Sequence, residues 1–138
     1  MQLSFIVIDD SELDCYIARK LILQTSDRVS VKTFFAATDA LTDIIIDDAE
    51  TNKGLTVILL DLMMPEMNGF QFIETFEKLP SGIQQKYFVV ALTSSMNRKD
   101  LVRLSSYQSI HFVLDKPFTF EKLNLIVEKA KGDFIKKT

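Results

Sequence analysis

The chain has 138 residues, 47% of them hydrophobic, and a formal net charge of -3 at pH 7. This length fits one domain, and the apolar content supports a packed core rather than a disordered chain. The acidic balance argues against a nucleic-acid binder, which needs a basic face for phosphate contacts. The single cysteine, Cys15, excludes an intrachain disulfide framework and a cysteine-rich zinc site.

The amino-terminal segment MQLSFIVIDD has no basic region before its short apolar run, so it does not read as a secretory signal. No apolar stretch approaches the roughly 20 residues of a membrane span. We therefore expect a soluble, cytoplasmic protein that binds neither nucleic acid nor a membrane.

Short apolar runs alternate along the chain with segments whose apolar residues recur at helical spacing. Thr38 and Asn97 (or a neighbour of Asn97) are the expected N-caps of two helices, and Pro80 with Gly82 marks a loop. In chain order, the prediction is strand 3–8, helix 11–25, strand 29–36, helix 40–49, strand 56–60, helix 70–79, loop 80–85, strand 88–92, helix 97–107, strand 110–114 and helix 118–135.

Five strands alternating with five helices predict an α/β fold, in which a parallel sheet carries helices on both faces. Right-handed crossovers leave few topologies for such a chain. We expect one domain over residues 3–131, followed by a short tail or linker stub at 132–138.

Reactive side chains follow four of the five predicted strands. They are Asp9-Asp10, Asp61, Thr93 and Lys116. Because the carboxyl ends of parallel strands share one edge of the sheet, we expect these side chains to meet there. Neighbouring carboxylates repel each other, and a hard divalent cation such as Mg²⁺ would relieve that repulsion.

This set of residues suits phosphoryl transfer. The carboxylate of Asp61 is a nucleophile towards phosphorus, while the cation and Lys116 would neutralise phosphoryl oxygens and Thr93 would offer a hydroxyl. Each residue alone has a plainer interpretation, because acids favour helix N-termini, Thr93 could belong to a polar loop, and lysines are mostly solvated. The four strand ends together favour a functional site.

With these residues at its strand ends, the chain closely resembles the receiver domain of two-component response regulators. The resemblance rests on the Asp9-Asp10 pair, on LLDLMMPEMNG around Asp61, on ALTSS around Thr93 and on DKPF around Lys116, and it extends from about Leu3 to Lys131. It implies a flavodoxin-like (βα)5 sandwich whose five-stranded parallel sheet has the order 2-1-3-4-5.

The resemblance also implies roles for individual residues. Asp61 would accept a phosphoryl group from a histidine kinase or a histidine phosphotransfer protein, and Thr93 and Lys116 would contact that group. Mg²⁺ or Mn²⁺ would be held by Asp9, Asp10, Asp61 and the backbone carbonyl of Met63. The Lys116-Pro117 bond is expected to be cis. The protein would be a signalling switch rather than an enzyme, without an output domain, and its surface from about Arg98 to Lys122 would meet a downstream partner.

Two features depart from the family pattern. Val113 stands three residues before the lysine, where an aromatic switch residue is usual, and Phe112 precedes it. Neighbouring residues of a strand face opposite ways. Either a bulge therefore brings Phe112 into the switch position, or the coupling between Thr93 and the aromatic switch residue is altered. Met63 and Ser95 occupy the positions that tune dephosphorylation, and a methionine cannot orient an attacking water, so we expect a long-lived phosphoryl group.

Two other functions, a phosphatase and a flavodoxin-like binding module, fit the sequence less well. A haloacid-dehalogenase-like phosphatase also uses a strand-end aspartate, but Asp61-Leu62-Met63 lacks its second acid and the chain has no room for a cap domain. A flavodoxin-like binding module would need a phosphate-cradling loop after the first strand, where Asp9-Asp10 would repel a phosphate. The receiver domain is therefore the leading hypothesis.

Overall fold

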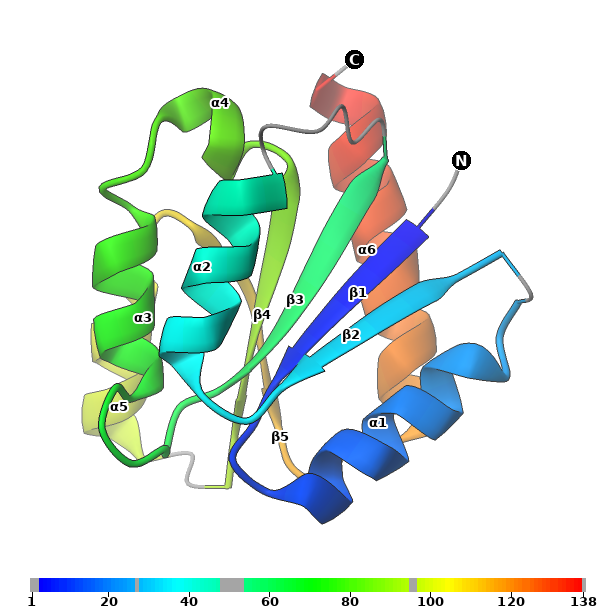
Figure 1. The fold of residues 1–138 in the computed structure, drawn as a ribbon, viewed down its shortest axis with the longest axis horizontal. Helices are drawn as coiled ribbons and strands as arrows, with labels where there is room; N and C mark the ends of the chain where they lie inside the picture. Colours follow the sequence, from blue (N-terminus) through cyan, green and yellow to red (C-terminus); the bar gives the residue numbers. More distant parts are fainter. Residues whose placement is uncertain (1–2, 27, 48–53, 95–96, 138) are drawn as a thin grey trace.

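A computed structural model describes residues 3–26, 28–47, 54–94 and 97–137 of the chain (Figure 1). In chain order, the elements are β1 (Leu3–Ile8), α1 (Glu12–Leu23), β2 (Ser30–Phe34), α2 (Ala37–Asp47), β3 (Leu55–Asp61), α3 (Gly69–Phe76), α4 (Ser81–Gln84), β4 (Tyr87–Thr93), α5 (Arg98–Ser105), β5 (Ile110–Asp115) and α6 (Phe120–Lys137).

The five strands form one parallel sheet in the order β2-β1-β3-β4-β5, which confirms the predicted flavodoxin-like topology. Helices α1 and α6 cover one face, and α2, α3 and α5 cover the other (Figure 1). Every residue of β3 and β4, two of the three inner strands, is buried. Burial on both faces explains why these strands read in the sequence as continuous apolar runs rather than as alternating patterns.

The sheet separates two apolar layers. On one side, Cys15, Ala18 and Ile22 of α1 pack with Leu123 and Ile126 of α6 against the sheet. The opposite layer is built from small and aliphatic residues of α2 and from the aromatic residues of α3. Its members include Ala40, Ile44, Phe72, Ile73 and Phe76. The helices thus fix the carboxyl ends of the strands from both faces.

Polar caps place the helices that matter for the site. Ser11 caps α1, Asn68 forms a capping box with Gln71 at the start of α3, and Asn97 caps α5 as predicted. The prediction that Thr38 caps α2 is wrong, because Thr38 lies inside the helix. Helix α2 begins one residue earlier, at Ala37, a buried residue with high helix propensity.

Two other segments differ from the expectation. Residues 81–84, expected to be a loop, form the short helix α4, because the Gln84 side chain donates hydrogen bonds to the carbonyls of Glu77 and Leu79 beyond α3 and folds the segment back. Residues 132–137, expected to belong to a tail, continue α6 to Lys137. The domain boundary at residue 131 stays a prediction.

A bulge interrupts the pairing of β4 with β5. Val89 lies opposite Ile110 and Val90 opposite Phe112, so His111 is the extra residue. The Nδ1 atom of His111 accepts a hydrogen bond of 3.2 Å from the backbone N–H of Val89, and its ring stacks on Phe88 with 4.7 Å between centroids. Imidazole therefore supplies an acceptor in a ladder that the bulge disrupts, which gives His111 a structural role.

The bulge does not move Phe112 into the switch position. Phe112 packs against the layer under α1 and α6, whereas Val113 packs on the opposite side with Leu62, Ala91 and Leu104. The structure therefore excludes the first alternative, because Val113 and not Phe112 packs on the side of the sheet that α5 covers. The altered coupling stays a prediction.

Gly69 shapes the turn that follows Asp61. Its N–H donates a 3.0 Å hydrogen bond to the carbonyl of Leu62, and its Cα approaches the preceding turn closely. A Cβ at this position would lie 2.7 Å from Leu62 Cα and 2.9 Å from the carbonyl oxygen of Asp61. The absence of a side chain, not a positive φ, is what this position requires, since no described glycine has a positive φ.

Gly69→Ala should therefore lower the free energy of unfolding by about 1–3 kcal/mol, because the added methyl group overlaps backbone atoms that cannot move freely. Gly82→Ala is the matched control, since a Cβ at Gly82 meets nothing within 4 Å and alanine favours the helix α4. Urea denaturation of both variants measures the difference. Equal stabilities would contradict the proposed crowding at Gly69.

Candidate functional site

The predicted site residues of β1, β3 and β4 meet at the carboxyl edge of the sheet, which lies at the bottom of Figure 1. Parallel register sets their positions, because Ile8 pairs with Leu60 and Asp61 pairs with Leu92, the residue before Thr93. Asp9, Asp61 and Thr93 are buried, whereas Asp10 is exposed. The sequence therefore placed these residues at one edge correctly.

Three carboxylates form a cluster at this edge. One oxygen from each of Asp9, Asp10 and Asp61 lies within 4.8 Å of the others. Burying two carboxylates side by side is unfavourable unless positive charge compensates them. An all-oxygen set of this kind, with one solvent-facing member, fits a hard divalent cation such as Mg²⁺ that retains part of its water shell.

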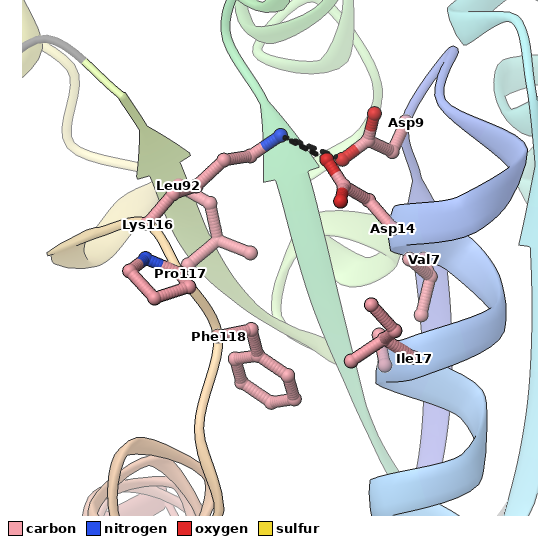
Figure 2. Close-up of a pocket in the computed structure, with 9 residues that line it drawn as sticks. Val7, Asp9, Asp14, Ile17, Leu92, Lys116, Pro117 and Phe118 are labelled. Carbon is pink, nitrogen blue, oxygen red and sulfur yellow. Dashed lines mark hydrogen bonds and ion pairs between the residues drawn. The ribbon is translucent and has the colours of Figure 1, made fainter.

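Lys116 reaches this cluster from the far edge of the sheet. Its backbone N–H donates a 2.9 Å hydrogen bond to the carbonyl of Thr93, and the Lys116-Pro117 peptide bond is cis, as predicted. Its ammonium lies 2.8 Å from Asp9 Oδ2 and 3.5 Å from Asp61 Oδ1. Figure 2 shows the side chain extended across the carboxyl end of β3 towards β1 and α1.

The electrostatics follow from this geometry. Burial, reinforced by the charge of Asp9, raises the pKa of Asp61 to about 6 despite the nearby ammonium. For Lys116, burial opposes the charged form, but the hydrogen bond to Asp9 and the charges of Asp61 and Asp9 outweigh it, so its pKa is raised. The lysine is thus locked in its charged form, while Asp61 is held in a site that disfavours uncompensated negative charge.

One residue of the site, Asp14, was not predicted from the sequence. Asp14, in the first turn of α1, lies 3.1 Å from the Lys116 ammonium through Oδ2. Its spacing from the N-cap Ser11 resembles a capping box, in which an acidic residue three positions after the cap bonds back to the cap. That local interpretation hides a contact between residues that are 102 positions apart.

The remaining predicted residues differ in what surrounds them. The Met63 side chain is 63% exposed, and its backbone N–H lies 3.4 Å from Asp61 Oδ1. Ser95 lies outside the described residues.

Cys15 donates from Sγ to the carbonyl of Asp9 at 3.2 Å, and burial with the charges of Asp9 and Asp14 raises its pKa to about 11. A thiol held in its protonated form fits a structural rather than a redox role.

The raised pKa of Asp61 predicts a pH-dependent stability difference. A carboxylate whose pKa is higher in the folded protein than its ordinary 3.8 destabilises the fold once it ionises, so its cost is absent below pH 4 and complete above about pH 6. In chelator-containing buffer, Asp61→Asn should therefore raise the free energy of unfolding by about 1–3 kcal/mol at pH 7.5 and by much less at pH 4.

Urea titrations across this pH range measure the effect, with Glu128→Gln on the exposed surface of α6 as the control for losing one negative charge. A stability difference that is constant with pH would show that Asp61 titrates normally in the folded chain.

Comparisons with known proteins agree with this geometry. The sequence pattern of the response regulator receiver domain matches residues 5–128. A response regulator receiver protein from Dyadobacter fermentans is 30% identical, with a TM-score of 0.82, and the match covers 93% of this chain and 97% of that one. A two-component response regulator from Cytophaga hutchinsonii is 22% identical, with a TM-score of 0.83 and coverage of 95% and 98%.

A CheY-like receiver domain protein from Methanospirillum hungatei shares the fold at 18% identity, with a TM-score of 0.78 and coverage of 99% of both chains. Within the described residues, no helix is long and apolar enough to cross a membrane. The family match, the sheet order and the acidic edge lead to one conclusion: the chain belongs to the response regulator receiver domain family, the phosphoacceptor domains of two-component signalling.

Proposed function

We propose that Asp61 is the residue of this receiver domain that accepts the phosphoryl group. The observation that carries the proposal is the position of Asp61, a buried carboxylate at the end of β3 that belongs to the acidic cluster and also lies 3.5 Å from the Lys116 ammonium. A nucleophile next to both a cation-binding cluster and a fixed ammonium suits attack on an anionic phosphoryl group.

The transfer balances simply. A carboxylate oxygen of Asp61 forms a bond to phosphorus while the bond between phosphorus and the donor imidazole nitrogen breaks. The imidazole leaves with the electron pair and takes up a proton, and Asp61 becomes an acyl phosphate. Lys116 would neutralise one phosphoryl oxygen, and the buried Thr93 hydroxyl would hydrogen-bond another.

Asp9, Asp10 and Asp61 would hold Mg²⁺ or Mn²⁺, with the Met63 carbonyl as a further ligand, and the all-oxygen cluster supports this assignment. When bound, the ion supplies positive charge at the transferring phosphoryl group. The chain's own residues do the rest, since β1 and β3 fix the carboxylates and the hydrogen bond from Lys116 N–H to Thr93 ties the lysine to the end of β4.

Receiver domains interact with histidine kinases or histidine phosphotransfer proteins, and one of these would supply the phosphoryl group here. We place the downstream partner on α5, β5 and α6, the surface from about Arg98 to Lys122 that the sequence indicated. Since Val113 occupies the switch position, we expect this surface to respond without rotation of an aromatic side chain at that position; Val113 is half-buried and packs against the cluster of Leu62, Ala91 and Leu104.

Acetyl phosphate with Mg²⁺ should label the wild-type chain with one acid-stable, base-labile phosphoryl group, and Asp61→Asn should abolish the label because the nucleophile is lost. Asp43→Asn, which removes an aspartate on α2 paired with Lys32, is the control and should label normally. Intact-mass spectrometry measures the adduct. Labelling of Asp61→Asn would disprove the assignment of the acceptor.

The decay of the label tests the role of Met63. Replacement by asparagine places an amide beside the acyl phosphate, where it can orient a water molecule that methionine cannot hold. We expect Met63→Asn to shorten the phosphoryl half-life several-fold, as followed by mass spectrometry after removal of the donor. Met63→Leu is the matched control, and a wild-type decay as fast as that of Met63→Asn would contradict the prediction.

A further inference from the structure

The Lys116 ammonium has a carboxylate partner outside the acidic cluster. Asp14 Oδ2 lies 3.1 Å from Lys116 Nζ, only slightly farther than Asp9 Oδ2 at 2.8 Å (Figure 2). Asp61 Oδ1 is more distant, at 3.5 Å. We propose that Asp14 is a positioning residue that holds Lys116 at the site during phosphoryl transfer. This inference rests on the proposed role of Asp61 as the acceptor.

Helix capping does not account for the orientation of the Asp14 side chain. At the third position after the Ser11 cap, its carboxylate would ordinarily accept the backbone N–H of Ser11. Here Asp9 Oδ1 accepts that N–H at 2.9 Å, and the cap is completed by Ser11 Oγ accepting from the Asp14 backbone N–H. The Asp14 carboxylate is thereby released from the cap and turns to Lys116.

The surroundings of Lys116 show why its position depends on ionic partners. The lysine side chain lines a cavity of about 390 Å³ whose other walls are largely apolar. The Val7, Leu92 and Phe118 side chains in Figure 2 line this cavity and offer the ammonium no hydrogen-bond acceptor. Its described side-chain acceptors are the carboxylates of Asp9 and Asp14, with Asp61 slightly farther away.

An ammonium has three N–H donors, and three carboxylates surround this one. Asp9 and Asp61 belong to the cluster that suits a cation, whereas Asp14 does not. During transfer, the oxygens of Asp9 and Asp61 would be engaged with the cation and the phosphoryl group. Asp14 would then remain as the acceptor that directs a free N–H of Lys116 towards the phosphoryl oxygens.

The test measures the rate of Asp61 labelling by acetyl phosphate as a function of Mg²⁺ concentration. Asp14→Asn should lower the maximal rate roughly two- to fivefold, the range for a partly solvated ion pair, and leave the Mg²⁺ concentration at half-maximal rate unchanged. Glu12→Gln is the matched control, because it removes one charge from the same helical turn and should label at the wild-type rate.

A second comparison separates positioning from folding. If Asp14 acts through Lys116, then Asp14→Asn should have no further effect in the slow-labelling Lys116→Ala chain, so the two losses should not add. The inference is overturned if Asp14→Asn labels at the wild-type rate, if Glu12→Gln slows labelling equally, or if the loss persists in Lys116→Ala. Labelling that survives Asp61→Asn would instead overturn the proposed acceptor, so the two failures are distinct.

Discussion

The ammonium of Lys116 is the contact on which the site depends. It lies among carboxylates from the end of β1, from α1 and from the end of β3, and its own backbone is bonded to the end of β4. Without this positive charge, two buried carboxylates would lie side by side with no compensation, which a folded protein tolerates poorly. One side chain thus joins elements that the sheet pairing and the apolar packing of α1 also hold together.

The same arrangement explains the state of Asp61. Its site combines burial and a neighbouring acid, which disfavour ionisation, with an ammonium, which favours it, and the result is a pKa raised to about 6. Such a residue is poised to gain from added positive charge, whether from a cation or from a closer approach of Lys116. The raised pKa of Asp61 and the reactivity proposed for it would therefore have one physical origin, a buried carboxylate next to another acid.

The bulge in β5 lies away from the acidic edge of the sheet, near the start of the strand. His111 closes the disrupted ladder with its own imidazole, so the strand recovers its register before Val113 and still delivers Lys116 to the site. The side chains of Phe112 and Val113 pack on opposite faces of the sheet. The end of β5 still delivers Lys116 to the acidic edge, while Val113 joins a mixed aliphatic and aromatic cluster on the α5 side that includes Phe70 and Tyr107.

The sequence predicted most of the fold because local patterns report burial. Strands β3 and β4 are buried along their whole length, so their apolar runs were unambiguous, and Asn97 caps α5 as a local signal predicted. The helix α4 escaped prediction because Pro80 and Gly82 are typical of loops, and the contact that folds the segment comes from the Gln84 side chain to carbonyls outside it. The N-cap prediction for Thr38 failed because α2 begins one residue before it, at the buried Ala37.

By itself, the sequence determined the family, the sheet and the residues that gather at its carboxyl edge, because parallel strands bring their ends together whatever lies between them. Only the tertiary structure decided which partner each of these residues has. Asp14 resembles a helix-cap residue in the sequence but is a partner of Lys116 in the fold. The side of the sheet that Val113 faces depends on the bulge in β5, which the sequence does not reveal. Charge pairing across 102 residues depends on side-chain geometry in space, which no local pattern encodes.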